Sequence, residues 1–199
     1  NETISEIWLN AAELEIHSAS LEPAGGSPTE ATGITLHERE ERAQITLASP
    51  ASPGSYVIHA SFTGILNDKL RGFYRSKFTD SEGKERLIAT TQFESTDARR
   101  AFPCFDEPDF KAVYGVTLGV REDLFAVSNG PLVSEIADGK GKKTAIFADT
   151  MKMSTYLVAF IVGPLAAPPP ASRRACSTRR TPRPATRRRA AACRSPAAA

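Results

Sequence analysis

Short runs of alternating apolar and polar residues, separated by Gly- and Pro-rich breaks, recur along most of the chain and constrain its fold most strongly. In the clearest run, residues 56–63, the apolar row consists of Tyr56, Ile58, Ala60 and Phe62. Neighbouring side chains of a β-strand point to opposite faces, so this run predicts a strand with one apolar row against a core. No stretch keeps a helical period over about 10 to 12 residues. The sequence therefore predicts an all-β fold of about ten short strands.

Seven further runs are separated by turn signals, and they cover residues 7–17, 34–38, 43–48, 73–79, 86–93, 114–120 and 155–162. The last of these is continuously apolar and is expected to form one strand buried on both faces. The segment Asp80-Ser81-Glu82-Gly83 predicts the turn of a hairpin. The charged segment 38–42 predicts a solvated turn.

The composition changes abruptly near Pro164. The 199 residues carry 25 basic and 23 acidic side chains, but positions 166–199 contain nine Arg and no Lys, Asp or Glu. Because those positions also lack Leu, Ile, Val, Met and aromatic residues, we expect a disordered segment at 165–199 and one folded domain at 1–164. Our hypothesis for 165–199 is an out-of-frame segment. The alternatives are a natural disordered tail and a basic arm that contacts nucleic-acid phosphates.

Cysteine usage and hydropathy bear on the compartment. The three cysteines suggest no disulfide framework. The longest apolar run, 156–162, is far shorter than the roughly 20 residues of a membrane span, and no signal peptide opens the chain. We therefore expect a cytoplasmic protein with no membrane partner, although the chain opens at Asn1 and preceding residues could have carried a signal.

Three separated motifs identify a family resemblance. They are TTQFESTDARRAFPCFDEPDFKAVYGVTL at 90–118, GFYRSKF at 72–78 and MSTYLVAF at 153–160. In this order and spacing they resemble the amino-terminal domain of the zinc-dependent gluzincin aminopeptidases of the alanyl and puromycin-sensitive type, the aminopeptidase N-like family. The resemblance implies a saddle-shaped, β-sandwich-like domain whose first strands are missing here. It also implies a place in enzymes that remove amino-terminal residues from peptides.

The catalytic metal site of that family has no counterpart in this sequence. A gluzincin needs two His one helical turn apart with a Glu between them that deprotonates the zinc-bound water. The chain has only His17, His37 and His59; Glu38 follows His37, but position 41 is Glu41. The family's Gly-Ala-Met-Glu-Asn loop is also absent. We therefore expect this chain to contain no catalytic residue and no metal ligand, and to be inactive on its own. We expect zinc in a missing catalytic domain, which would be the partner of this chain.

The resemblance assigns substrate contacts to two residues. The acidic residue at the position of Glu94 takes the free α-ammonium of the peptide, and the residue at Gln92 lines the pocket for the first side chain. A carboxylate in a partly desolvated pocket holds an ammonium through charge-assisted hydrogen bonds. Residues two apart on a strand face the same side, so we expect Gln92 and Glu94 to point together. From the residues alone, a solvated strand face is the alternative.

Other residues of the 90–118 motif are interpreted as structural. Asp106 and Glu107 are expected to pair with Arg99, Arg100 or backbone amides and so brace a tight turn. Three aromatic residues are expected to anchor the core, and they are Phe102, Phe105 and Phe110. Cys104, with no His nearby in the sequence, is expected to be a small buried apolar residue.

Three functions thus remain open. The first is a substrate-anchoring fragment of a zinc aminopeptidase acting on peptides with a free amino terminus. The second is a non-catalytic module that binds peptides or a partner protein through the face around Gln92 and Glu94. The third, a nucleic-acid binder, depends on the basic segment alone and is the least favoured.

Overall fold

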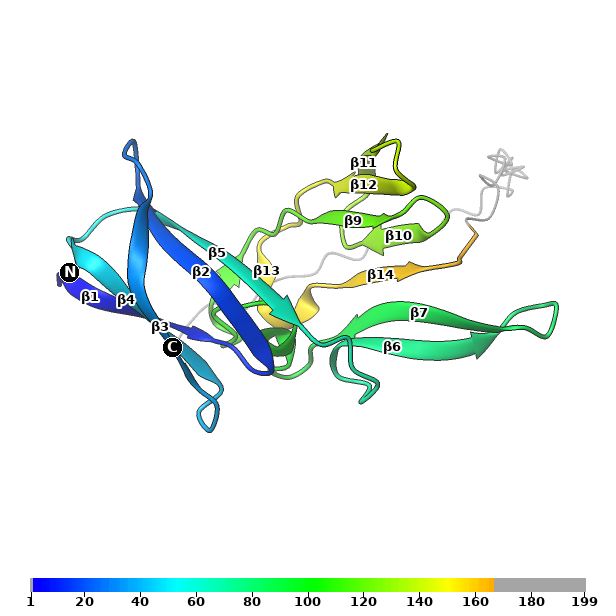
Figure 1. The fold of residues 1–199 in the computed structure, drawn as a ribbon, viewed down its shortest axis with the longest axis horizontal. Helices are drawn as coiled ribbons and strands as arrows, with labels where there is room; N and C mark the ends of the chain where they lie inside the picture. The colour runs from blue at the N-terminus through cyan, green and yellow to red at the C-terminus, as the bar shows by residue number, and fades with distance from the viewer. Residues whose placement is uncertain (1, 167–199) are drawn as a thin grey trace, which may run out of the picture. The chain divides into compact units, whose positions relative to one another are not determined.

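The computed structural model describes residues 2–166, which form an all-β unit of fourteen strands and two single-turn 3₁₀ helices (Figure 1). The predicted fold class is confirmed, with more strands than the ten expected. The expected disorder of 165–199 lies almost wholly outside the described residues. Within residues 2–166, no helix is long and apolar enough to cross a membrane.

A five-stranded antiparallel sheet forms the first half of the described chain. Its strand order is β1-β4-β3-β2-β5. The strands are β1 (Ile4–Asn10), β2 (Leu14–Pro23), β3 (Thr29–His37), β4 (Arg42–Ala51) and β5 (Tyr56–Gly64). Two small buried clusters hold it together, one around Leu9, Ala19 and Ile45 and the other around Ala11, Leu14 and Ala43. Because Ile58 and Phe62 of β5 pack against these clusters, the expected apolar row does reach a core, although Tyr56 and Ala60 are exposed.

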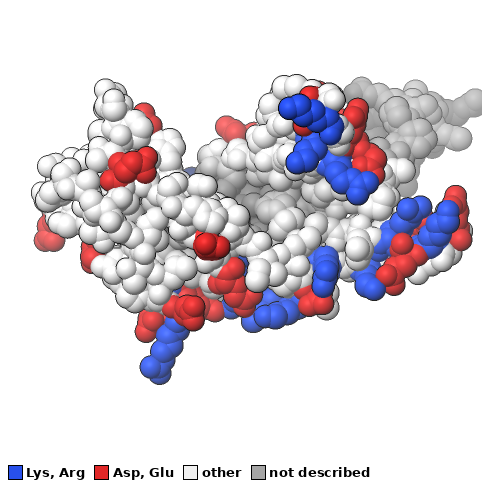
Figure 2. All heavy atoms as spheres, viewed as in Figure 1, with Lys and Arg blue, Asp and Glu red and all other residues white. Residues whose placement is uncertain are grey.

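A second sheet of four strands has the order β10-β14-β7-β6. It consists of β6 (Gly72–Thr79), β7 (Glu85–Gln92), β10 (Phe125–Ser128) and β14 (Phe160–Gly163). Strands β6 and β7 form the predicted hairpin, in register from Gly72↔Gln92 to Thr79↔Glu85. Figure 2 shows basic and acidic side chains intermixed along this hairpin. The visible face of the hairpin is therefore neither a basic nor an acidic patch.

Two smaller sheets complete the unit. Strands β11 (Leu132–Ala137), β12 (Lys142–Phe147) and β9 (Thr117–Arg121) form one, and β13 (Met153–Ser154) pairs with β8 (Lys111–Ala112) in the other. The 3₁₀ helices are η1 (Ala98–Arg100) and η2 (Thr155–Leu157). A cluster of Phe93, Ala98 and Val158 gathers aromatic residues from both sides of η1 and includes Phe160 of the second sheet.

The predicted runs 34–38, 43–48 and 114–120 differ at their boundaries from β3, β4 and β9, and two other strand predictions miss a turn. Residues 155–162 do not form one buried strand, because the chain turns through η2 before the four half-buried or buried residues of β14. Residues 7–17 form two strands, because the chain reverses at Glu13, whose φ is 56°. A run of apolar residues shows that a segment is buried, but its periodicity does not show where the backbone turns.

The prediction that three aromatic residues anchor the core is wrong for two of them. Phe102 packs against the Phe93 cluster as predicted. Phe105 is 47% exposed and Phe110 is 58% exposed, and their rings contact each other at a centroid distance of 5.7 Å. Together they line an open cavity of about 620 Å³. The sequence places aromatic residues near a turn, but only the tertiary structure decides which side of the turn meets a core.

Candidate functional site

The two residues expected to contact substrate lie at the end of β7. Gln92 is the last residue of that strand and is exposed, Phe93 is 2% exposed, and Glu94 is exposed again. Burial therefore alternates through the strand end, with Phe93 pointing into the core and the residues on either side of it reaching solvent. Gln92 and Glu94 both remain accessible to a ligand.

Phe93 is the residue that fixes this strand end. Its ring makes edge-to-face contacts with Phe102 and Phe160, at centroid distances of 5.8 and 6.1 Å. Beyond it, the backbone N–H of Asp97 donates to the carbonyl of Phe93 at 2.9 Å, which closes a turn that contains Glu94. The Glu94–Ser95 peptide bond in this turn is cis. Within residues 2–166 Glu94 forms no ion pair, so its carboxylate is free to take a cation.

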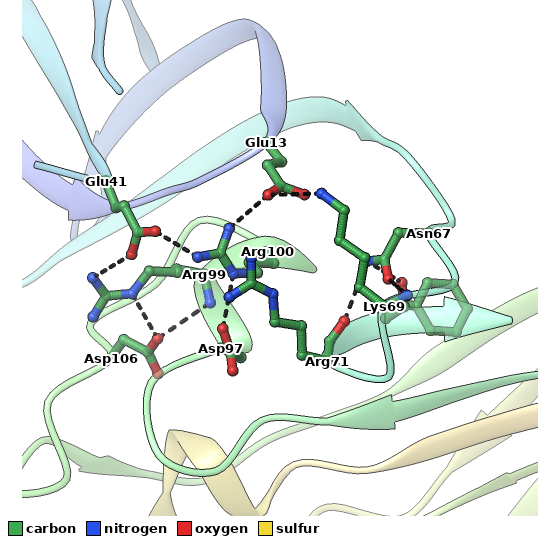
Figure 3. A network of polar contacts seen from close by, with 10 residues as sticks. Glu13, Glu41, Asn67, Lys69, Arg71, Asp97, Arg99, Arg100 and Asp106 are labelled. Atoms are coloured by element: carbon green, nitrogen blue, oxygen red, sulfur yellow. Dashed lines mark hydrogen bonds and ion pairs between the residues drawn. The ribbon is translucent and has the colours of Figure 1, made fainter. Parts of the chain in front are cut away.

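A network centred on Arg99 and Arg100 of η1 lies directly after this turn (Figure 3). Arg100 donates to Asp97 at 2.8 Å, to Glu13 at 2.9 Å, and to Glu41. Burial disfavours the Arg100 cation, but these three carboxylates outweigh that effect and raise its pKa. The guanidinium therefore stays charged and is held by acids from three separate segments.

Arg99 binds a different carboxylate. Its Nε and its backbone N–H both donate to Oδ2 of Asp106, at 3.0 and 3.2 Å, and its side chain also reaches Glu41 at 3.4 Å. The predicted pairing of Asp106 with a neighbouring arginine is confirmed. Glu107, predicted in the same role, is exposed and forms no side-chain hydrogen bond or ion pair within residues 2–166.

Burial dominates the titration of Asp106 and Cys104. It raises the pKa of Asp106, although hydrogen bonds from Arg99 act in the opposite direction, and Oδ1 of Asp106 has no hydrogen-bond partner among the described residues. Burial also raises the pKa of the Cys104 thiol well above its ordinary value. Because the thiolate is the nucleophilic form, Cys104 is unsuited to catalysis, as the sequence indicated.

Backbone hydrogen bonds join the same segment to the five-stranded sheet. Asn10 and Cys104 exchange N–H to carbonyl bonds of 2.8 and 3.1 Å, and Ala12 donates to the carbonyl of Arg99 at 2.9 Å. The backbone N–H of Asp106 donates to the side chain of Asn10 at 3.2 Å. The segment that follows β7 is therefore the junction between the two larger sheets.

Sequence reasoning missed the two glutamates of the network. Residues 38–42 were expected to form a solvated turn, and a turn is present, but Glu41 in it is half-buried and pairs with both arginines. Glu13 lies 87 positions from Arg100. The sequence carried only a weak signal for these residues, because Glu13 and Glu41 are each a charged residue near a turn. Folding is what brings both of them to Arg100.

No metal centre forms among the described residues. His17 contacts Thr63, His37 contacts Gln44 and His59 pairs with Glu22, each on a different part of the first sheet. Across residues 2–166, no three His, Cys, Asp or Glu side chains converge as metal ligands. The cavity beside Phe105 and Phe110 is also lined by Lys152 and Thr155. Gln92 and Glu94 are not among its lining residues.

The described unit is an all-β domain that exposes the Glu94 carboxylate on the turn after β7. The chain belongs to the peptidase M1 N-terminal domain family, whose model matches residues 1–157. The resemblance drawn from the three sequence motifs is thereby confirmed.

Curated relatives agree with this assignment. The chain is 43% identical over 165 residues to the puromycin-sensitive aminopeptidase of Caenorhabditis elegans, covering 82% of this chain and 17% of that protein. It is 42% identical to the mitochondrial aminopeptidase 2 of Saccharomyces cerevisiae, covering 83% and 17%. It is 41% identical to aminopeptidase M1 of Arabidopsis thaliana, covering 79% and 18%. The chain thus spans less than a fifth of the length of these relatives.

Proposed function

We propose that this domain anchors the free amino terminus of peptide substrates for a zinc aminopeptidase, whose catalytic domain is a separate part of the polypeptide or a partner. Glu94 takes the α-ammonium, and Gln92 lines the pocket for the first side chain. The observation that carries the proposal is the free, exposed carboxylate of Glu94 on a turn braced from both sides, in a chain of the peptidase M1 N-terminal domain family.

The chemistry of an aminopeptidase requires such a group. The enzyme must recognise the end of a peptide by its charged amine and place the first peptide bond at a fixed distance from it. A carboxylate that is enclosed when a second domain covers it forms charge-assisted hydrogen bonds with that amine. Zinc and the activated water belong to the other domain, and the residues described here orient the substrate.

A fusion enzyme tests this role. Residues 1–164 would replace the matching segment of the Caenorhabditis relative, and hydrolysis of an alanine anilide would be measured for the parent fusion and for Glu94→Gln. A hydrogen bond to a charged group contributes roughly 1.5–3 kcal/mol, so kcat/KM should fall by about 10- to 100-fold. Gln92→Ala should instead change the preference among first side chains.

Glu82→Gln is the matched control, because Glu82 is an exposed carboxylate in the turn of the β6–β7 hairpin. It should leave kcat/KM unchanged. An inactive parent fusion, or a Glu94→Gln variant that behaves like Glu82→Gln, would contradict the anchoring role.

A non-catalytic peptide- or protein-binding module is the second candidate, favoured by the same exposed face. The 199-residue chain alone would then bind peptides with a free amino terminus more tightly than their acetylated forms in calorimetry. Equal binding of both forms would exclude it. Affinity for DNA that falls steeply with salt would instead favour the nucleic-acid interpretation of the basic segment.

We propose a folded unit at 1–164 in a cytoplasmic protein. Limited proteolysis should leave a stable fragment that ends near Pro164, and a fragment trimmed into β14 would contradict that boundary. Fractionation of cells expressing the protein tests its location.

A further inference from the structure

We propose that Arg100 is a positioning residue, which holds the turn carrying Glu94 against the five-stranded sheet through Asp97, Glu13 and Glu41. This role rests on the proposed function of Glu94. Arg100 does not itself contact substrate; it sets the direction in which the Glu94 carboxylate points.

The turn has few bonds of its own. Residues 94–96 are exposed, and within residues 2–166 one backbone hydrogen bond, from the Asp97 N–H to the Phe93 carbonyl, closes the turn. The second restraint on Asp97 comes from Arg100, whose Nε donates to the carboxylate and whose backbone N–H donates to the Asp97 carbonyl at 3.2 Å. Without the arginine, the C-terminal side of the turn would depend on short-range backbone bonds alone.

The other two guanidinium nitrogens connect the turn to the first sheet. One donates to Glu13, between β1 and β2, and the other to Glu41, between β3 and β4. Only an arginine presents a planar fork that reaches three carboxylates at once. With a side chain 10% exposed, Arg100 forms these pairs where water screens them weakly.

The backbone at both glutamates is strained. Glu13 has a φ of 56° and Glu41 a φ of 52°, in the left-handed region that glycine or asparagine occupies more easily. Both glutamates are bonded to the same arginine, so the ion pairs help to hold the backbone in this region. Strain of this kind marks functional segments when the surrounding structure maintains it.

Gly72 provides the space for Arg100. It is paired with Gln92 across the hairpin, has a φ of 69°, and a Cβ placed on it would lie 2.8 Å from the Cβ of Arg100. The arginine therefore packs directly on the strand pair that ends in Gln92. Both expected substrate contacts, Gln92 and Glu94, are adjacent to backbone that Arg100 restrains.

Hydrogen exchange on the full 199-residue chain tests the restraint directly. In Arg100→Gln the amide of Asp97 should exchange about tenfold faster or more, because opening of this turn no longer breaks the ion pairs. The matched control is Arg86→Gln, which removes an Arg–Asp pair of the same 2.8 Å length at the other end of the hairpin. It should leave Asp97 exchange unchanged.

Kinetics of the fusion enzyme test the consequence for substrate. Arg100→Gln should raise KM by about tenfold with a smaller effect on kcat, since a misplaced anchor weakens binding before it affects the zinc chemistry. Glu41→Asn is a second test. Asparagine adopts the left-handed backbone more easily than glutamate but is too short to reach Arg99 or Arg100. The gain in backbone conformation offsets only part of the lost ion pairing, so the unfolding free energy should fall while the domain stays folded, and KM should rise.

The outcomes are distinguishable. Unchanged kinetics for Glu94→Gln would remove the anchoring function itself. The positioning role alone would be overturned by a different result. In that result Glu94→Gln lowers kcat/KM as expected, but Arg100→Gln and Glu41→Asn have the same KM and the same Asp97 exchange rate as Arg86→Gln.

Discussion

The two ends of the β6–β7 hairpin are built from the same parts in different surroundings. Each end has a glycine in the left-handed region, Gly72 at 69° and Gly83 at 78°, and an Arg–Asp contact of 2.8 Å. At the inner end the arginine is 10% exposed, whereas Arg86 at the outer end is 42% exposed. Two Arg–Asp pairs of equal length therefore need not contribute equally to the free energy of folding, because water screens the exposed pair more strongly than the buried one. We expect the buried pair also to restrain nearby side chains more strongly.

The largest expected difference concerns the apolar residue at each end. Phe93 is 2% exposed and Leu87 is 51% exposed. Phe93→Ala should lower the free energy of unfolding by about 3–5 kcal/mol, because it leaves a cavity in the aromatic cluster. Leu87→Ala should cost less than about 1 kcal/mol. Urea unfolding followed by circular dichroism measures both, and similar losses would show that the inner end is not a core.

The acidic residues should differ next. Among the described residues, Asp106→Ala leaves the Arg99 guanidinium, 14% exposed, with its 3.4 Å contact to Glu41 alone. Removing one partner of a buried pair is costly, so the unfolding free energy should fall by about 2–4 kcal/mol. Asp80→Ala at the exposed outer turn should have a much smaller effect. Equal losses in urea unfolding would remove the distinction between the two pairs.

The glycines give a smaller and more selective contrast. Ala at either position takes the strain of a left-handed backbone, about 1–2 kcal/mol. At Gly83 the added Cβ meets nothing within 4 Å, whereas at Gly72 it would lie 2.8 Å from the Cβ of Arg100. Gly72→Ala should therefore cost about 1–3 kcal/mol more than Gly83→Ala. The difference in thermal midpoints between these variants measures it, and none is expected if Arg100 moves freely.

The smallest expected difference is in pH dependence, where the two ends have opposite signs. Burial raises the pKa of Asp106, so its contribution becomes less favourable as pH rises through its ordinary range toward the raised pKa. Hydrogen bonding from Arg86 lowers the pKa of Asp80, so its contribution is present above the ordinary pKa and is lost as pH falls through the lowered one.

Unfolding of Asp106→Asn and Asp80→Asn, each compared with the parent between about pH 3 and 7, checks both signs. The stability of the parent relative to Asp106→Asn should fall as pH rises, and relative to Asp80→Asn it should rise. Parallel curves would mean that burial does not control the titration of Asp106.

Much of the fold could be predicted because its signals are local. The hairpin around Asp80–Gly83 and the strand at 56–63 were found from alternation and turn residues, and the structure places both within one residue of the expected limits. Residues 155–162 could not be predicted, since a uniformly apolar run is compatible with a strand or with a turn that packs into a core. The exposure of Phe105 and Phe110 was missed because aromatic residues near a turn do not show which side of the turn meets a core.

The candidate site was predicted unevenly. Gln92 and Glu94 came from the family resemblance, and the Asp106–Arg99 pair from the proximity of opposite charges in the sequence. The roles of Gln92 and Glu94 remain predictions. Glu13 and Glu41 could not be identified, because each is an ordinary charged residue near a turn until folding places it beside Arg100.

Alternation and turn chemistry act between neighbouring residues, so the amino-acid order was sufficient for an all-β domain, for its hairpins and for its family. The convergence of three carboxylates on Arg100 joins residues 3, 59 and 87 positions apart. Such a contact depends on how two sheets pack against the segment between them. Burial, and with it the pKa of Asp106 and the restraint on the Glu94 turn, was decided only when the tertiary structure removed these groups from water.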